Sequence, residues 1–88
     1  MEKRIGSVLI LVSDKSVAST LNIIISEFAD IIIGRQGLPT QSTGQGIISL
    51  VLEGSTDQIG ALTGQLGRLS GVSVKSVVLK FKNQDEEN

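Results

Sequence analysis

One stretch, Val8–Val12, constrains the fold of this chain more than any other, because every residue in it is apolar. Successive side chains of a β-strand point to opposite faces of a sheet. Leu9 and Leu11 therefore lie on one face and the other three residues on the opposite face, so both faces are apolar. This pattern is typical of a strand at the centre of a sheet, covered on both sides. We predict that Arg4–Val12 is that central strand.

The length of the chain limits how much apolar surface it can bury. Its 88 residues suit one small domain, to which we assign the bounds 1–82, followed by a disordered acidic tail at 83–88. Hydrophobic residues make up 40 % of the sequence and charged residues 19 %, which is a globular composition. A domain of this size buries only about 60 % of its unfolded surface. Small domains often gain stability by associating with further copies of the same chain, because the contact buries more apolar surface.

The charge and the missing residue types exclude several functions. The net charge is −1 and the basic residues form no stripe, so we expect no direct binding to nucleic acid. The sequence contains no cysteine and no histidine, which removes thiolate and imidazole metal sites and the usual general base at neutral pH. We expect no metal, no cofactor and no enzymatic activity.

The sequence also carries no membrane or secretion signal that we can identify. No signal peptide is visible, and the longest apolar run is five residues, against about 20 for a membrane span. We expect no membrane association and a cytoplasmic location.

The spacing of the apolar residues changes after the first strand. Residues at helical spacing predict an amphipathic helix over 15–29. Strand patterns follow at 30–39 and 46–53, and a polar loop at 40–45 joins them as in an antiparallel hairpin. The last strand pattern covers 72–82.

A second helix precedes this last strand. Ser55 and Gln58 have the spacing of a capping box at its start, and Gly71 is placed to end it in a left-handed conformation. Glycines recur along the side of this helix away from its leucines, at Gly60, Gly64 and Gly67. They indicate either the close approach of a neighbouring element or subunit, or simply an exposed, weak helix.

The order of these elements is that of an α+β, ferredoxin-like βαββαβ domain. Right-handed crossovers then give a four-stranded antiparallel sheet, in the order 4-1-3-2, with both helices on one face. The other face is left bare, although the first, third and fourth strands carry apolar residues on it. We expect a homo-oligomer, either dimer or tetramer, formed through the sheet face or a sheet edge. The alternative is a modest exposed patch on a loosely patterned small domain.

Motifs for chemistry are scarce. The glycines after residue 33 do not form a phosphate-binding loop, because no lysine follows at the required position and no helix begins there. A polar cluster lies where the first strand passes into the first helix, and it consists of Ser13, Asp14, Lys15 and Ser16. Free N–H groups at a helix start can receive an anion, so this cluster is a candidate ligand site, with plain helix capping as the alternative. Arg35 and Gln36 are further candidates for contact with a ligand or a partner, with surface solvation as the alternative.

Two longer segments, Asp30–Pro39 and Ala61–Lys75, resemble a small bacterial family whose members are described as regulators of the iron-only hydrogenase system. The likeness covers about Arg4–Lys80. The family resembles stand-alone ACT-type domains and is also similar to the C-terminal effector domain of the nickel-responsive repressor. The resemblance implies a ferredoxin-like, ACT-like fold, oligomers built from extended sheets, and a regulatory role linked to transcription.

The sequence departs from these relatives at two points. The nickel-responsive relatives bind metal through histidine and cysteine, which this chain lacks, so nickel binding is not implied. Amino-acid-binding ACT domains have a glycine-containing turn after the first strand, whereas Ser13–Ser16 contains no glycine. The resemblance transfers no catalytic residues.

Two functions fit these observations. The first is a non-enzymatic regulatory module that acts as an oligomer, with a small effector bound at a subunit interface near Ser13–Ser16. The second is a structural or protein-interaction subunit, without a small ligand, that docks its sheet onto a protein partner.

Overall fold

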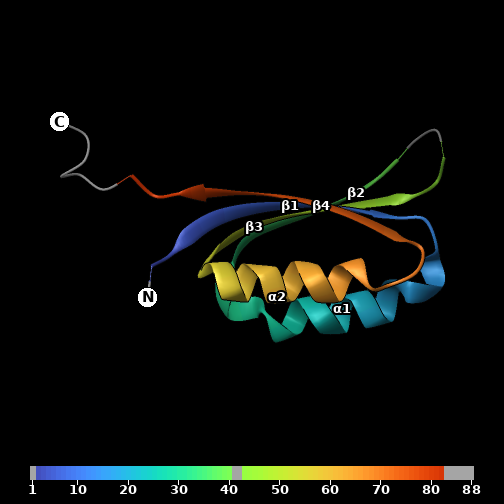
Figure 1. Cartoon of the computed structure of the whole chain (residues 1–88). Helices are drawn as coiled ribbons and strands as arrows, with labels where there is room; N and C mark the ends of the chain where they lie inside the picture. Colours follow the sequence, from blue (N-terminus) through green and yellow to red (C-terminus); the bar gives the residue numbers. More distant parts are fainter. Residues whose placement is uncertain (1, 41–42, 83–88) are drawn as a thin grey trace.

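The computed structural model describes residues 2–40 and 43–82, which form one sheet and two helices (Figure 1). The elements are β1 (Arg4–Val12), α1 (Ala18–Glu27), β2 (Ile32–Pro39), β3 (Gly46–Gly54), α2 (Thr56–Gly67) and β4 (Val72–Lys80). Two short 3₁₀ turns flank α1, namely η1 (Lys15–Val17) and η2 (Ala29–Ile31). The strands are antiparallel in the order β2-β3-β1-β4, and both helices lie on one side of the sheet (Figure 1). The predicted ferredoxin-like α+β fold and its strand order are confirmed.

The central position of β1 is visible in its pairing. Along its whole length β1 pairs with β3 on one side, from Arg4 opposite Gly54 to Val12 opposite Gly46. On the other side it pairs with β4 over the same residues. The backbone N–H and C=O groups of β1 therefore face a partner strand on both sides, as expected of a strand that is buried.

The core lies between the sheet and the helices. One face of β1 and β3 supplies its floor, with Val8, Ile10, Val12, Leu50 and Leu52 all buried. The helices and η2 cover this floor with buried side chains of Leu21, Ile25, Ile31, Ile59, Leu62 and Leu66. Burying an aliphatic side chain of this size stabilises a fold by about 1.5–3 kcal/mol, so this layer holds the helices on the sheet.

The opposite face of the sheet has no cover within the described residues. Leu9, in the middle of the central strand, is 55 % exposed there, although Val8 and Ile10 on either side of it are fully buried. Because both crossovers place their helices on the same side, one molecule covers only one of the two apolar faces of β1 (Figure 1). We call the surface opposite the helices the bare face.

The first helix is shorter than predicted. The expected span of 15–29 divides into η1, α1 and η2, because i→i+3 hydrogen bonds replace α-helical ones at both ends. At the C-terminal end, the Ile31 N–H donates to the Phe28 carbonyl at 3.0 Å. The predicted strand over 30–39 therefore begins too early: Asp30 and Ile31 belong to η2, the side chain of Ile31 is buried in the core, and β2 begins at Ile32.

The capping box of α2 is confirmed at its start. The Gln58 N–H donates to Ser55 Oγ at 3.1 Å, and the Ser55 N–H donates to Gln58 Oε1 at 2.9 Å. At its end the prediction is partly wrong, because α2 stops at Gly67 and not next to Gly71. Gly71 has the predicted left-handed backbone, with φ 77°, but it serves the turn into β4. There its carbonyl accepts hydrogen bonds from the Ser13 and Asp14 N–H groups.

The ends of the other predicted segments follow from strand pairing. β4 ends at Lys80, two residues before the predicted end, because Arg4, the first residue of β1, pairs with Lys80. The expected hairpin joins β2 to β3, and the Thr40 N–H donates to the Gln45 carbonyl across its base at 2.8 Å. Residues 41–42 of the predicted loop and the predicted tail at 83–88 lie outside the described residues.

Neither helix in residues 2–40 and 43–82 has the length and apolar character needed to cross a bilayer.

The glycines of α2 generate a test of helix stability. Gly60 and Gly64 are exposed, and a Cβ added at either would meet no atom within 4 Å. No neighbouring element of the described chain approaches them, so the exposed, weak helix is the better interpretation. Gly60→Ala and Gly64→Ala should each raise the free energy of unfolding by roughly 0.5–1 kcal/mol, measured by urea denaturation.

Gly71→Ala is the matched contrast. Its left-handed backbone disfavours a side chain, and a Cβ there would come within 2.4 Å of Asp14 Cβ. This variant should lower the free energy of unfolding. A loss of stability on Gly60→Ala would contradict the prediction and indicate that another subunit packs against this side of α2.

Candidate functional site

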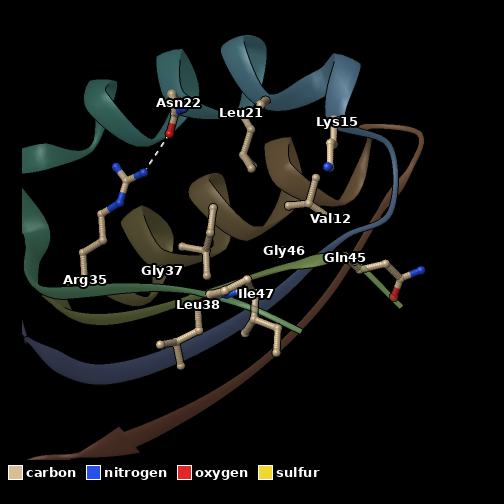
Figure 2. A pocket seen from close by; sticks show the side chains of 14 residues that line it. Val12, Lys15, Leu21, Asn22, Arg35, Gly37, Leu38, Gln45, Gly46 and Ile47 are labelled. Atoms are coloured by element: carbon tan, nitrogen blue, oxygen red, sulfur yellow. Dashed lines mark hydrogen bonds between the residues drawn. The ribbon is translucent and has the colours of Figure 1, made fainter. Parts of the chain in front are cut away.

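A hollow lies on the helix side of the sheet, between the start of α1 and the base of the β2–β3 hairpin (Figure 2). Its volume is about 410 Å³. Residues from β1, η1, α1, β2 and β3 line it, among them Val12, Lys15, Leu21, Arg35 and Ile48. Small-ligand pockets in proteins have volumes of about 300–1,000 Å³, so this hollow is large enough for a small molecule. We call it the hairpin pocket.

Glycines at the base of the hairpin create this space. Gly37 of β2 pairs with Ile48, and Gly46 of β3 pairs with Val12, so both occupy positions that face the helices. A Cβ added to Gly37 would meet nothing within 4 Å, and one added to Gly46 would only reach Val12 Cβ at 4.0 Å. Where other strand residues fill the space under the helices with side chains, these two leave it empty.

The hairpin pocket is positively charged. Lys15 and Arg35 line it, and no acidic residue is among the residues that line it. Arg35 Nη2 donates a hydrogen bond of 2.7 Å to Asn22 Oδ1, which ties β2 to α1 across the pocket (Figure 2). Asn22 is neutral, so it orients the guanidinium without cancelling its charge. The remaining guanidinium N–H groups stay available to an anion.

Two of the six predicted ligand residues meet in this pocket. Lys15 and Arg35 are far apart in the sequence, and Figure 2 shows Lys15 pointing from the chain before α1 toward the strands. Gln36 does not join them: it pairs with Ser49, one position along from Arg35, and so points to the bare face.

The other three predicted residues make hydrogen bonds within the protein, one to the turn before β4 and two within the cluster itself. Ser13 Oγ donates to the Gly71 carbonyl at 3.2 Å. The Asp14 carboxylate accepts from the Ser16 N–H at 2.9 Å and from Ser16 Oγ at 2.7 Å. Asp14 thus caps the turn η1, which was the alternative role of this cluster. The hydrogen bonds from the Ser16 hydroxyl and N–H hold the pKa of Asp14 below its ordinary value, since they stabilise the charged form.

No separate signal in the sequence marks Asn22 or the two glycines of the pocket. In the sequence, Asn22 is one of several polar residues on the side of the predicted helix away from its apolar residues. It lies seven residues after Lys15, which is about two helical turns, and this spacing places both on one side of the helix. That spacing could have linked Asn22 to Lys15, but only the hairpin geometry brings Arg35 to them.

The bare face is the second candidate surface. Its exposed apolar residues come from all four strands and are between 37 % and 62 % exposed: Leu9, Leu38, Val51, Val77 and Leu79. A shallow hollow of about 220 Å³ lies at the end of the sheet where β1 begins, and its wall is mostly apolar. Among the described residues, no group of three or more histidine, cysteine, aspartate or glutamate side chains is placed to hold a metal ion.

Comparison with protein families shows which family the chain belongs to. Residues 4–76 match the TM1266-like family, described as "Iron-only hydrogenase system regulator, putative". The chain belongs to this family. A TM1266-like protein with a solved structure, the uncharacterized TM1266 from Thermotoga maritima, is 40 % identical, with a TM-score of 0.83 over 90 % of this chain and 100 % of that one. A comparison with curated proteins gives no match.

More distant solved structures share only the fold of this TM1266-like chain. The C-terminal domain of MgtC from Mycobacterium tuberculosis has a TM-score of 0.67 at 12 % identity, covering 92 % of this chain and 93 % of that one. The CPII protein of Thiomonas intermedia K12, bound to ADP, AMP and acetate, has a TM-score of 0.53 at 7 % identity, covering 98 % and 97 %.

The cap at Asp14 generates a prediction for acid stability. Because its pKa is lowered by folding from an ordinary value of 3.8, the cap stabilises the fold above that pH. The contribution is lost as the pH falls through the lower pKa of the folded state. Ser16→Ala removes the hydroxyl donor but keeps the N–H donor, so it should raise the pKa of Asp14 part of the way to 3.8, measured by NMR titration of the carboxyl carbon.

Ser19→Ala is the control, since Ser19 is an exposed serine of α1 outside this cap. It should leave the titration of Asp14 unchanged. An unchanged pKa of Asp14 in Ser16→Ala would show that the hydroxyl contributes nothing to the cap.

Proposed function

We propose that this protein is a non-enzymatic regulatory module of the iron-only hydrogenase system that acts as a homo-oligomer and responds to a small effector. Its membership of the TM1266-like family supports the regulatory role. The absence of histidine and cysteine from the sequence supports a role without catalysis, because the usual general base and thiol nucleophile are missing. With a net charge of −1, such a regulator would act on transcription through a protein partner and not by contacting DNA itself.

The observation that carries the proposal is the apolar bare face. Leu9 and Val51 are exposed at diagonal positions on the two inner strands, and Val77 and Leu79 extend the apolar surface onto β4. Soluble monomers rarely expose continuous apolar patches beyond a few hundred Å². A second copy of the same sheet, related by a two-fold axis, presents the same residues and would bury this surface symmetrically.

The polar residues of the bare face fit a symmetric contact between copies. Gln36 and Ser49 pair across β2 and β3, and Ser7 lies opposite Val77. These side chains are uncharged, so two copies of the face can meet there without repulsion between equal charges. The charged residues there are Lys75 on the edge strand β4 and Glu53 near one end of β3. Two copies that stack with opposite strand directions would bring lysine toward glutamate at the rim.

A protein-interaction subunit without a small ligand is the second candidate. It is favoured by the two edge strands, β2 and β4, whose outer edges pair with no other strand of the described chain. An open edge can receive a strand from a partner protein. This function would use the same bare face and edges but would leave the hairpin pocket without a role.

The proposal is tested by the mass of the protein in solution. Leu9→Glu places a charge in the middle of the bare face and should convert the oligomer to monomer at micromolar concentration, measured by sedimentation or light scattering. Leu9 is already half exposed in the single chain, so the variant should keep its circular dichroism spectrum.

Ile23→Glu is a closely matched control. Ile23 is 60 % exposed, against 55 % for Leu9, but it lies on α1, on the other side of the sheet. This variant should keep the mass of the wild-type oligomer. A monomeric wild-type protein, or an oligomer that Ile23→Glu dissociates and Leu9→Glu does not, would overturn the proposed interface.

A further inference from the structure

We propose that the hairpin pocket binds a small organic anion, whose acid group is held by Arg35 and Lys15 and whose apolar part lies against Ala18, Pro39 and Ile48. The inference rests on the proposed regulatory function, in which this anion is the effector. It places the effector site under α1 on the helix side of the sheet, away from the bare face.

The walls of the pocket select for a molecule with an apolar part. Ala18 of α1 and Ile48 of β3 are half-buried and Pro39 of β2 is exposed, so these three residues offer apolar surface to the pocket. Val12 and Leu21 lie behind them in the core. The exposed surface of the pocket is therefore mostly carbon, in a hollow of about 410 Å³. Binding sites for small molecules combine apolar walls of this kind with a few polar groups that fix orientation. A fully hydrated inorganic ion would gain little from such walls.

The polar groups select for negative charge. Two cations line the pocket and no acid does. The nearest carboxylate in the sequence to Lys15 belongs to Asp14, and it accepts two hydrogen bonds from Ser16 at the cap of η1. Arg35 is held at one side of the pocket by Asn22, so its planar donor group is already oriented before a ligand arrives.

The spacing of the cations indicates how the ligand lies. Lys15 of η1 precedes Asn22 of α1, the hydrogen-bond partner of Arg35, by seven residues, which at an α-helical rise is about 10 Å along the axis. An acid group that contacts Arg35 at the Asn22 position leaves the rest of the molecule beneath α1, in the direction of Lys15. The flexible side chain of Lys15 can then contact either the same acid group or a second polar group of the ligand. The site thus fits an elongated molecule better than a compact one.

Three probes with the same six-carbon chain test this site: hexanoate, hexyl phosphate and 1-hexanol. Each is titrated into ¹⁵N-labelled protein, and the amide shifts of Gly37 and Gly46 report on the pocket. At least one of the two anions should shift these amides and bind at least fivefold more tightly than the neutral alcohol. The better anion shows whether the effector carries a carboxylate or a phosphate. If neither anion binds more tightly than the alcohol, the proposal is wrong.

Variants then assign the charge preference to its residues. Lys15→Gln combined with Arg35→Gln should weaken binding of the better anion at least fivefold and leave hexanol binding unchanged. Lys80→Gln combined with Lys82→Gln also removes two positive charges, from exposed residues at the end of the sheet where Lys80 pairs with Arg4, and should change the affinity less than twofold. Wild-type affinity in the Lys15/Arg35 double variant, or a loss of affinity in the Lys80/Lys82 variant, would overturn the assignment.

Asn22→Asp provides a test that keeps both cations. The new carboxylate would lie at the Nη2 atom of Arg35, now 2.7 Å from the amide oxygen, and pair with its charge. Anion affinity should fall at least threefold at pH 7. An affinity that stays at the wild-type value would show that Arg35 does not contact the anion.

Measuring the mass of the same samples separates this inference from the proposed oligomer. The Lys15/Arg35 double variant should keep the wild-type mass while losing anion binding. If the wild-type protein is a monomer that still binds the anion through Arg35 and Lys15, the proposed anion site is supported and the proposed oligomeric function is wrong. If the wild-type protein is an oligomer that binds neither anion, the proposed anion site is wrong and the proposed oligomer is supported.

Discussion

The structure depends on one strand that is paired along both of its edges but covered on only one of its faces. β1 holds β3 and β4 in register, and its inner side chains, such as Ile10, lie under the helices with no exposed surface. Without this floor, neither helix would have an apolar surface to pack against. The same strand carries Leu9 on its outer side, where the single chain supplies no cover. The central strand therefore stabilises the fold and also creates the apolar surface on which the proposed oligomer is based.

The hairpin of β2 and β3 relates the two candidate surfaces to each other. Arg35 points into the hairpin pocket, whereas Gln36, the next residue, points to the bare face. Leu38 lines the pocket and is also half exposed. Because a strand alternates its side chains between two faces, one short segment takes part in both surfaces without any long-range pathway.

Local sequence signals predicted those features that depend on few neighbours. The period of the apolar residues gave the order of the elements, and the bounds of β1 were correct because both of its edges are paired over the same nine residues. The capping box at Ser55 was also correct, since its two hydrogen bonds join residues three apart. Predictions were least accurate at the ends of α1, where 3₁₀ turns replace the last helical residues. There the burial of Ile31 in the core, and not its strand propensity, decides the backbone conformation.

The sequence by itself determined that this chain has a two-sided apolar central strand, two helices to cover one side of it, and neither histidine nor cysteine for chemistry. It also singled out Lys15 and Arg35 as polar residues outside the core, but from unrelated segments. Only the tertiary structure decided that these two cations share a pocket, that Gln36 does not, and that Ser13 bonds to Gly71, a residue distant in the sequence. The reason is that apolar periodicity and capping are set by near neighbours in the chain. A pocket depends instead on how a hairpin and a helix, distant in sequence, are placed by the core between them.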